Sequence, residues 1–561
     1  MNREERYDIV IVGGGHNGTA AAAYLAKSGL SVCVLEERPE CGGACENTEV
    51  IPGVRIDPHT TYLYGGAAPG FEQLELWKYG FRMDWRESQR MMQQPRPTLT
   101  REGTYQPTEK DTMGWNKLCG MLADPPFTRE LLRSIYWCPP HPPEVEVTAE
   151  NVPFMQVYKQ HAPEIWTEEL LEMTLFDLLD EYMETEPPKV QQGIIAWYSG
   201  AAPHWEGVAL PALGGNLALR YTGINPPRGG MHAYMHSIIR CAMAHGAVIR
   251  TCCPVDEIII HQGRAVGVRL RETAAYGEKI IWANKAVISG IDVEQTFLKL
   301  IGPQHLDASL IQGVKDVNLK GSCAYVTHFL FKGEPQYRPR FEIESREAAA
   351  GPYPYPTDSR ENFYEHLMDV DGRKGGPTMP AERVVFLNCG SKRGIPDTCT
   401  IPDHTLISPC YVIVPPPEYL VGGPDAINKE KEKLDAYMLK ALDKIIDISN
   451  VVQMWSNTPW DSEHRNRGLI GGGWSPRPCR DQWGENRPNN LSPELARYRT
   501  PIDGLYLCHQ SSAHPGTMCL MAIPYNLMHI MIEDGLVEPG EWWYPSPWYI
   551  PQEGKISAKP R

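Results

Sequence analysis

The stretch of residues 7–18 constrains the fold of this chain most strongly, because it reads as a buried strand that runs directly into a glycine-rich turn. The apolar residues 9–12 are followed by Gly13, Gly15 and Gly18 in the spacing G-x-G-x-x-G. Glycines at these positions allow a tight turn and let a pyrophosphate approach the backbone amides at the start of the next helix. The spacing therefore predicts a dinucleotide-binding unit of strand, helix and strand.

The following residues continue the same unit. Alanines at positions 20–23 allow the predicted helix to pack closely on a sheet, and Gly29 stands where a helix C-terminus favours a positive φ. A second apolar strand is predicted over residues 31–35 and is closed by Glu36, 23 residues after Gly13. A carboxylate at that distance is positioned to accept hydrogen bonds from a ribose 2′-hydroxyl.

The choice of dinucleotide depends on the next few residues. Glu37 and Arg38 follow at once, and Gly42-Gly43-Ala44 comes soon after. Two adjacent glycines let the backbone pass close to a second phosphate and to the ribityl chain of a flavin, which extends further from adenosine than nicotinamide ribose does. FAD is therefore favoured as the cofactor. The predicted cofactor-binding residues in this part of the chain are Gly13, Gly15, His16, Asn17, Gly18, Glu36, Glu37, Arg38, Gly42, Gly43 and Ala44.

With these motifs in place, residues 7–85 resemble the phytoene desaturase-related flavoproteins. The resemblance rests on His16-Asn17-Gly18, Gly42-Gly43-Ala44 and Ile51-Pro52-Gly53. It is strongest to the branch called pyridine nucleotide-disulfide oxidoreductase domain-containing protein 2, whose members share the run at residues 72–80. The resemblance implies an FAD-dependent oxidoreductase.

Two later blocks extend the resemblance. Residues 227–231 precede a predicted helix, and in the family the residue matching Val255 presents backbone groups to the adenine. Residues 498–508 resemble the family's final strand, and His514-Pro515-Gly516 leads into a helix that is expected to end near Glu533. The predicted cofactor residues outside the first block are Val255, Cys508 and Met518.

Because the motifs lie at both ends and in the middle of the chain, the cofactor domain is expected to be assembled from separate segments. The implied fold class is α/β, with a discontinuous Rossmann-type FAD-binding domain and an inserted α+β substrate domain, in an amine oxidase or phytoene desaturase-like architecture. The FAD-binding domain is expected over residues 1–85, 225–300 and 455–537, the substrate-binding domain over 86–224 and 301–454, and an aromatic, proline-rich C-terminal arm over 538–561.

Charge and hydropathy limit the partners. The formal charge of −15, from 54 basic and 69 acidic residues, argues against nucleic acid. The first strand begins by residue 7, so no secretory signal is expected and a cytoplasmic location is predicted. No stretch has the length and apolar character of a membrane span, so membrane contact is expected to be peripheral at most. The C-terminal arm, with Trp542 and Trp543, packs on its own domain, contacts another subunit of a homo-oligomer, or touches a membrane.

The cysteines do not form a predicted redox pair. Cys41 and Cys45 are separated by three residues and Cys252 and Cys253 are adjacent, so neither pair has the C-x-x-C spacing of a disulfide reductase. The chain also has no second G-x-G-x-x-G motif. Neither a dithiol centre nor an NAD(P) domain is therefore expected, and no metal site is predicted.

The middle of the chain reads as the substrate domain, because residues 91–221 are rich in Pro, Trp, Met and acidic residues. The candidates for substrate contact are Trp115, Trp197 and Trp474, and Trp197 belongs to a bulky apolar set that lines a pocket or fills a core. Residues 345–380 are rich in Gly, Pro, Asp and Arg, so a surface loop or lid is expected there.

The chain departs from the family near the reactive ring of the flavin. Relatives show Cys-Gly-x-Gly after the last strand, whereas this chain has Cys508-His509-Gln510-Ser511, and Trp474 stands where relatives often place His. Larger side chains are expected to narrow the space beside the ring. The departures favour a compact apolar or alicyclic substrate over a long carotenoid.

A flavin accepts a hydride from a carbon that the protein holds against its ring. A saturated apolar substrate needs little help from a base, whereas a ketone or thioester has an acidified α-proton and needs a base opposite the ring. The candidate catalytic residues are Tyr198, His59 and His514. His514 contacts the ring or braces the turn in which it lies, and His59 follows the second phosphate loop.

These features predict an FAD-dependent dehydrogenase or desaturase that acts on CH–CH bonds. It is expected to move a hydride from a carbon of a compact apolar substrate, for example a cyclic ketone, to flavin N5 and so form a C=C bond. Two alternatives stay open. One is a non-catalytic flavin-fold scaffold or assembly factor, which the altered glycine loops favour. The other is a flavin amine oxidase, as in more distant relatives.

Overall fold

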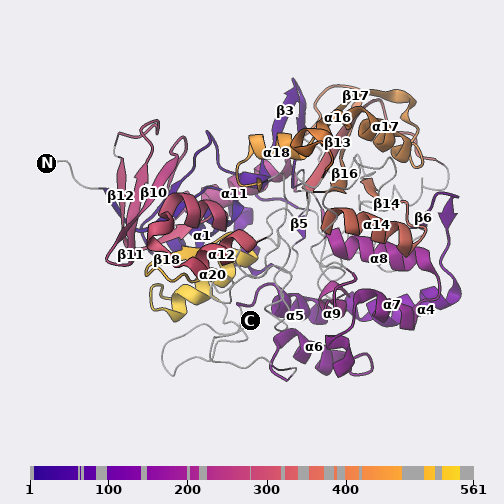
Figure 1. Ribbon diagram of the computed structural model, residues 1–561, viewed down its shortest axis with the longest axis horizontal. Coiled ribbons are helices and arrows are strands. Elements are labelled where there is room, and N and C mark those ends of the chain that lie inside the picture. The colour runs from indigo at the N-terminus through magenta and orange to yellow at the C-terminus, as the bar shows by residue number, and fades with distance from the viewer. Residues whose placement is uncertain are drawn as a thin grey trace.

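The chain folds into two halves, each built around its own sheet (Figure 1). The computed structural model describes residues 5–60, 63–64, 68–83, 98–139, 148, 150–198, 203–213, 224–225, 227–277, 279–317, 323–338, 353–371, 384–387, 398–415, 420–470, 498–511 and 521–543. Within these residues, no helix has the length and apolar character needed to cross a membrane.

The first half is a seven-stranded sheet that collects strands from three distant parts of the sequence. Its strands are β1 (Glu5–Val12), β2 (Val32–Leu35), β9 (Val248–Arg250), β10 (Val255–His261), β11 (Arg264–Leu270), β12 (Ile280–Ser289) and β18 (Leu505–Leu507). They lie in the order β10-β11-β12-β1-β2-β9, with β18 beside the end of β12. β1 pairs in parallel with β2 and with β12, whereas β10 and β11 form an antiparallel hairpin. The predicted Rossmann-type fold class is confirmed.

Helices cover one face of this sheet and a mixed layer covers the other. α1 (His16–Lys27), α11 (Gly230–Ala244) and α20 (Ala522–Glu533) lie over the face that carries Ile9 and Ile11. Val10 and Val12 point to the opposite face, where α12 (Ala308–Asp316) packs. A strand that is buried on both faces has apolar residues at successive positions, and this explains why residues 9–12 of β1 are all apolar.

Glycine sets how closely α1 approaches the sheet. A Cβ at Gly18 would overlap the carbonyl oxygen of Gly13, so a larger residue would push the start of the helix away from β1. At the other end, α1 stops at Lys27, and Gly29 has the predicted positive φ of +88°. The local sequence therefore fixes both ends of this helix.

The second half is an antiparallel sheet of five strands. These are β13 (Cys323–Lys332), β14 (Tyr353–Tyr355), β15 (Val385–Leu387), β16 (His404–Val414) and β17 (Val451–Asn457), in the order β14-β15-β16-β13-β17. α17 (Lys431–Leu442) covers one face, where Tyr325 and Phe329 of β13 pack against Met438. The domain boundary predicted at residue 455 falls inside β17, which pairs with β13 of this second sheet.

A group of helices extends below this second sheet (Figure 1). They are α4 (Glu109–Cys119), α5 (Pro125–Ile135), α6 (Pro153–His161), α7 (Leu175–Tyr182), α8 (Glu186–Tyr198), α9 (Ala209–Pro211) and α14 (Arg360–Asp371). The shorter helices elsewhere are α2 (Pro69–Gln73), α16 (Ala426–Lys429) and α18 (Pro459–Arg465). Small antiparallel pairs are β3 (Thr48–Ile51) with β4 (Val54–Ile56), β5 (Leu63–Tyr64) with β8 (Ile224–Asn225), and β6 (Thr98–Leu99) with β7 (Thr104–Tyr105).

The loop or lid predicted over residues 345–380 is wrong in part, because β14 and α14 lie within this segment. Phe363 and Leu367 of α14 are buried, and Phe363 packs edge-on to Phe176 and Trp197. The i, i+4 spacing of these apolar residues gives α14 a face that contacts the neighbouring helices. Tertiary packing outweighs the Gly- and Pro-rich composition of the segment.

The described beginning of the C-terminal arm packs on its own domain. Trp543 is 1% exposed and lies with its ring centroid 5.3 Å from that of Tyr24 in α1 and 5.0 Å from that of Tyr525 in α20. Trp542 stacks on Tyr24 at 6.0 Å. The sequence left three packing partners open for this arm, namely its own domain, another subunit or a membrane. The first residues of the arm pack on the half that is built on the first sheet.

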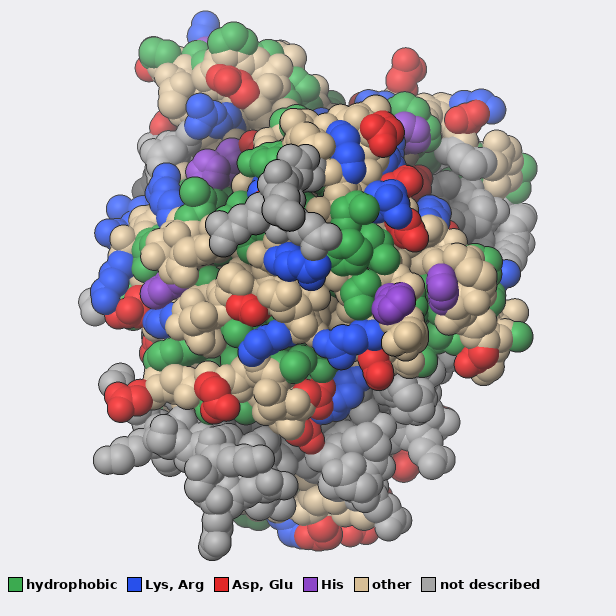
Figure 2. Space-filling view, turned by 90° about the vertical axis from the view of Figure 1, so that its left-hand side faces the viewer, with side chains coloured by type: hydrophobic (Ala, Val, Ile, Leu, Met, Phe, Trp, Pro, Cys, Tyr) green, Lys and Arg blue, Asp and Glu red, His purple; other side chains and the backbone are tan. Residues whose placement is uncertain are grey.

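Charges of both signs alternate over the end of the molecule that carries the first sheet (Figure 2). An example is the pair of Arg269 and Glu257, which form an exposed salt bridge at 2.9 Å across β10 and β11. A surface that binds nucleic acid gathers Lys and Arg without matching acids. The view in Figure 2 has no such arrangement on its described surface.

Two glycines near α4 provide a test of the helical packing. A Cβ at Gly114 would overlap the carbonyl oxygen of Tyr182 in α7, whereas a Cβ at Gly120 would meet nothing within 4 Å. We expect Gly114→Ala to lower stability by about 1–3 kcal/mol, because α4 and α7 must move apart. Gly120→Ala should have no effect or raise stability by up to about 1 kcal/mol. Thermal unfolding followed by circular dichroism measures both, and equal melting temperatures for the two variants would contradict the packing.

Candidate functional site

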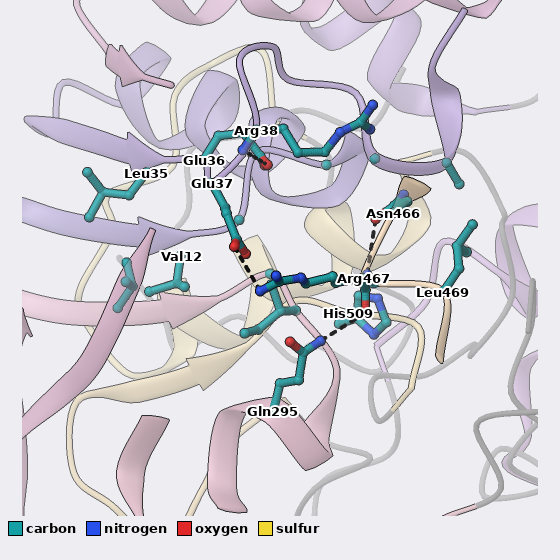
Figure 3. Close-up of a pocket in the computed structure, with 18 of the residues that line it drawn as sticks. Val12, Leu35, Glu36, Glu37, Arg38, Gln295, Asn466, Arg467, Leu469 and His509 are labelled. Atoms are coloured by element: carbon teal, nitrogen blue, oxygen red, sulfur yellow. Dashed lines mark hydrogen bonds and ion pairs between the residues drawn. The ribbon is translucent and has the colours of Figure 1, made fainter. Parts of the chain in front are cut away.

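A cavity of about 250 Å³ lies at the carboxyl ends of β1 and β2 (Figure 3). Val12 and Gly13 at the end of β1 and Leu35 at the end of β2 form one side, and His16 and Asn17 at the start of α1 form another. β1 has β2 on one side and β12 on the other, so the strand order reverses here. Ligands of doubly wound sheets bind at this kind of switch point.

Most of the predicted cofactor residues come together at this cavity. The lining includes Gly13, Gly15, His16, Asn17, Glu36, Glu37, Arg38, Gly43, Ala44 and Val255. Gly18 lies beneath the turn, Gly42 pairs with Gly15, and Cys508 is buried with its Sγ 3.7 Å from the carbonyl oxygen of Asn17. Met518 lies outside the described residues.

Two glycine loops meet backbone to backbone at the base of the cavity. The amide of Gly42 donates to the carbonyl oxygen of Gly14 at 3.0 Å. A Cβ on Gly43, where φ is +56°, would lie 3.1 Å from the Cα of Gly15, and one on Gly14 would lie 2.5 Å from the Sγ of Cys41. Side chains at these positions would force the two loops apart and so change the base of the cavity. The buried Oδ1 of Asn17 has no hydrogen-bond partner among the described residues, which also fits a bound polar group.

Glu36 joins these loops. Its Oε2 accepts a hydrogen bond from the amide of Gly14 at 2.7 Å and its Oε1 accepts one from the amide of Arg38 at 2.9 Å. Burial raises the pKa of Glu36, and the two backbone donors oppose that shift. A carboxylate has about four acceptor positions. The carboxyl group therefore keeps acceptor capacity for a ribose while it holds the turn.

The wall of the cavity opposite β2 comes from the segment that follows α18. Arg467 forms an ion pair with Glu37 at 2.9 Å, and its carbonyl oxygen accepts a hydrogen bond from Gln295 at 3.1 Å (Figure 3). Glu37 also lies 3.4 Å from Arg271 of the β11 end. Sequence reasoning missed this wall. Its arginines match no motif, and they reach the cavity only because the fold brings residues 465–469 back to the first sheet.

A buried ionic network lies between the two halves, next to the second glycine loop. The carboxylate of Glu46, 2% exposed, contacts Arg38, Arg465 at 3.0 Å and the Nδ1 of His59 at 3.2 Å. Burial alone would raise the pKa of Glu46, but His59 and Arg38 together hold it at about 2. Burial lowers the pKa of His59 despite the opposing effect of Glu46. At neutral pH the carboxylate is therefore charged and the imidazole is neutral.

Two more buried titratable groups lie beside this network. His328 of β13 holds its Nδ1 2.5 Å from the Oγ of Ser408, and burial lowers its pKa to about 3. Asp57 accepts a hydrogen bond from Asn47 at 3.0 Å, and burial raises its pKa to about 7. The junction between the two sheets is thus lined by polar groups that are mostly uncharged.

The remaining predicted site residues lie apart from the cavity or are not described. Trp115 of α4 is buried in the main core, and Trp197 of α8 packs edge-on to Phe363 at 5.6 Å, so neither lines this cavity. Tyr198 is the last residue of α8. His514 and Trp474 lie outside the described residues, and the roles of these five side chains stay predictions. The described part of the chain holds no group of three or more His, Cys, Asp or Glu residues arranged for a metal ion.

Comparisons with known proteins agree with this geometry. Residues 11–74 match the family described as NAD(P)-binding Rossmann-like domain. The chain is 26% identical to pyridine nucleotide-disulfide oxidoreductase domain-containing protein 2 of Rattus norvegicus over 94% of each chain. It is 24% identical to a limonene dehydrogenase subunit of Castellaniella defragrans over 97% of each chain.

Solved structures give the same fold. Wild-type putrescine oxidase bound to putrescine matches with a TM-score of 0.55 and 15% identity, over 95% of this chain and 100% of that one. Cyclohexylamine oxidase from Brevibacterium oxydans matches with a TM-score of 0.53 and 15% identity, over 94% and 99%. The amine oxidase-like architecture is confirmed, the resemblance seen in the motifs extends over nearly the whole chain, and FAD is the dinucleotide that this cavity fits.

Glu36 gives a direct test of the cofactor site. Glu36→Gln replaces one of the acceptor oxygens by an NH₂ group that faces a backbone donor. We expect FAD affinity to fall by about 10- to 100-fold, since hydrogen bonds to a charged group are worth about 1.5–3 kcal/mol. Quenching of FAD fluorescence by apoprotein measures the affinity, and Glu257→Gln on exposed β10 is the control. Unchanged affinity in the Glu36 variant would show that this carboxylate does not serve the cofactor.

The ion pair between Arg467 and Glu37 is expected to retain the cofactor. Arg467→Gln should accelerate FAD dissociation by up to about fivefold at low ionic strength, because a partly exposed pair contributes at most about 1 kcal/mol. The difference should shrink at high ionic strength, where the wild-type pair is screened. Stopped-flow release of FAD measures the rate. Arg269→Gln removes a similar exposed ion pair whose members do not line the cavity, and it should leave the rate unchanged.

Proposed function

We propose that the protein is an FAD-dependent dehydrogenase that oxidises a CH–CH bond of a compact apolar substrate to C=C. Bound FAD supplies the hydride acceptor of such a reaction. The observation that carries the proposal is the buried pair of His59 and Glu46 between the cofactor half and the substrate half. Hydride removal from carbon leaves a proton to be taken up, and this pair has the charge states that proton uptake requires.

The network around His59 explains how the chain prepares a base. Arg38 and Arg465 keep Glu46 ionised, so Glu46 accepts the Nδ1 hydrogen of neutral His59. An imidazole held in this way carries its lone pair on Nε2, and the adjacent carboxylate stabilises the imidazolium that forms after proton uptake. Burial keeps the ring neutral before the reaction. His59 is thus the candidate base of the three that the sequence predicts.

The likeness to the limonene dehydrogenase chain supports dehydrogenation of a compact apolar molecule. The word subunit in the name of that protein gives it at least one partner, and we propose that the present chain also assembles into an oligomer. The cytoplasm stays the proposed location. The amine oxidase alternative is supported by the names of two structural relatives, whose low identity shows the fold alone.

Anaerobic reduction of the bound flavin distinguishes these functions. Purified holoprotein is mixed with cyclic ketones, isoprenoids or amines while the visible flavin band is followed. Bleaching by a ketone or isoprenoid supports the dehydrogenase, and bleaching by amines alone supports an amine oxidase. A holoprotein that none of them reduces supports the scaffold alternative.

His59→Asn tests the proposed base. We expect flavin reduction to slow by about 10²- to 10⁴-fold while FAD stays bound. His161→Asn is the control, because His161 forms an imidazole–carboxylate pair with Glu130 at 3.1 Å on the surface of the helical region. In the wild type the rate should be level near neutral pH and should fall only in acid, below the ordinary imidazole value of 6.5, because protonated His59 cannot accept a proton. An equal rate of flavin reduction in the His59→Asn variant and the wild type would contradict the assignment of His59 as the base.

A further inference from the structure

Two of the three described histidines that line the dinucleotide cavity, His16 and His509, face it from opposite elements. His16 is the first residue of α1, and His509 lies two residues after the end of β18, on the far side of β12 from β1. Both line the cavity, and the ring of His509 lies near Arg467 and Gln295 in Figure 3. At the ring of His509, the structure describes hydrogen bonds to another residue only at Nδ1. At the ring of His16, it describes no hydrogen bond to another described residue.

The loop after β18 fixes which nitrogen of His509 carries hydrogen. The backbone amide of Ser511 donates to the Nδ1 of His509 at 3.1 Å, and the Ser511 hydroxyl lies 2.9 Å from the same atom. A backbone amide can only donate, so Nδ1 is an acceptor. The hydrogen of the neutral ring is therefore on Nε2, the nitrogen directed away from this loop.

The arginines at the cavity are already committed to carboxylates. Arg38 and Arg465 pair with Glu46, and Arg271 and Arg467 pair with Glu37. These are all the arginines among the described lining residues. The charge of a bound pyrophosphate must then be met by the amides at the start of α1, which has no side-chain cap, and by the imidazoles.

We propose that His16 and His509 together contact the pyrophosphate of FAD, with His509 donating its Nε2 hydrogen and His16 taking up a proton from solvent as the cofactor binds. The proposal rests on FAD as the cofactor and is independent of the reaction proposed above. It gives the cofactor affinity a pH dependence that the glycine motif alone does not provide, because helix amides do not titrate.

The charges around the pair set the sign of this dependence. Burial lowers the pKa of both rings to about 4, and His509 lowers that of His16 further, so the two rings are neutral in the empty cavity at pH 7. A pyrophosphate anion within contact distance raises the pKa of His16. His509 stays neutral, because its Nδ1 accepts the hydrogen bond of the Ser511 amide. Binding therefore takes up a proton, and FAD affinity rises as the pH falls toward the pKa of His16 in the complex.

Other charged and titratable groups that face the cavity limit the pH range in which FAD affinity rises. They are Glu36, Glu37, Arg38, Arg271, His464, Arg465 and Arg467. Glu36 is the carboxyl group whose pKa burial raises, and its protonation in acid would weaken the ribose contact. The gain in affinity is thus expected between about pH 8 and about pH 5.5, and protonation of Glu36 opposes it toward acid.

Calorimetry of apoprotein tests the proposal without any catalytic reaction. FAD, ADP and adenosine are titrated in two buffers of different ionisation enthalpy, because a difference in the observed heat measures protons taken up. We expect uptake with FAD and ADP, and FAD binding about three- to tenfold tighter at about pH 5.5 than at about pH 8. Adenosine, which carries no phosphate, should bind without uptake. Equal heats in the two buffers for FAD, or uptake with adenosine, would overturn the assignment.

Variants then assign the proton to His16. His16→Asn, alone or with His509→Asn, should abolish the uptake and the pH dependence, whereas His509→Asn alone should weaken the binding of FAD and ADP and leave the uptake unchanged. His261→Asn, at an exposed position on β10, is the control and should behave as the wild type. Full uptake in the double variant would refute the role of these rings. If the double variant does not bind ADP, the single variants and the ADP and adenosine comparison in the wild type still decide the question.

Discussion

The cofactor half depends on one close contact between two pieces of backbone, the turn after β1 and the glycine pair after β2. The amide of Gly42 donates to the carbonyl oxygen of Gly14, and a Cβ at Gly43 would lie 3.1 Å from the Cα of Gly15. Glu36 holds the same turn through the amide of Gly14. This contact sets the base of the cavity, because a larger residue at Gly43 would force the two loops apart.

A buried carboxylate joins the cofactor half to the half built on the second sheet. Glu46 contacts Arg38 from the loop after β2, Arg465 from the end of α18 and His59, and the neighbouring neutral His328 belongs to β13 of the second sheet. Removing one partner of such a buried group leaves a charge uncompensated, which is strongly destabilising. The same contacts therefore tie the two sheets together, and burial among them lowers the pKa of His59.

Sequence patterns predicted the elements whose causes are local. The glycine spacing, the alanines of α1 and Gly29 placed the first strand, helix and strand correctly, and the helix expected to end near Glu533 does so. The loop or lid predicted over residues 345–380 was wrong in part, because α14 gains its stability from packing Phe363 against other helices. Composition carries no information about such partners, and this explains why the wall formed by residues 465–469 was also missed.

The sequence by itself determined that the chain begins with a dinucleotide-binding unit, because a tight turn at Gly13 and a close approach at Gly18 require glycine wherever that unit occurs. Only the tertiary structure decided which side chains complete the site. Arg467 reaches Glu37 across 430 residues of sequence and Arg465 reaches Glu46 across 419, and the neutral state of His59 follows from its burial in that network. Charge states and cavity walls depend on distances and solvent exclusion, and both are set by folding.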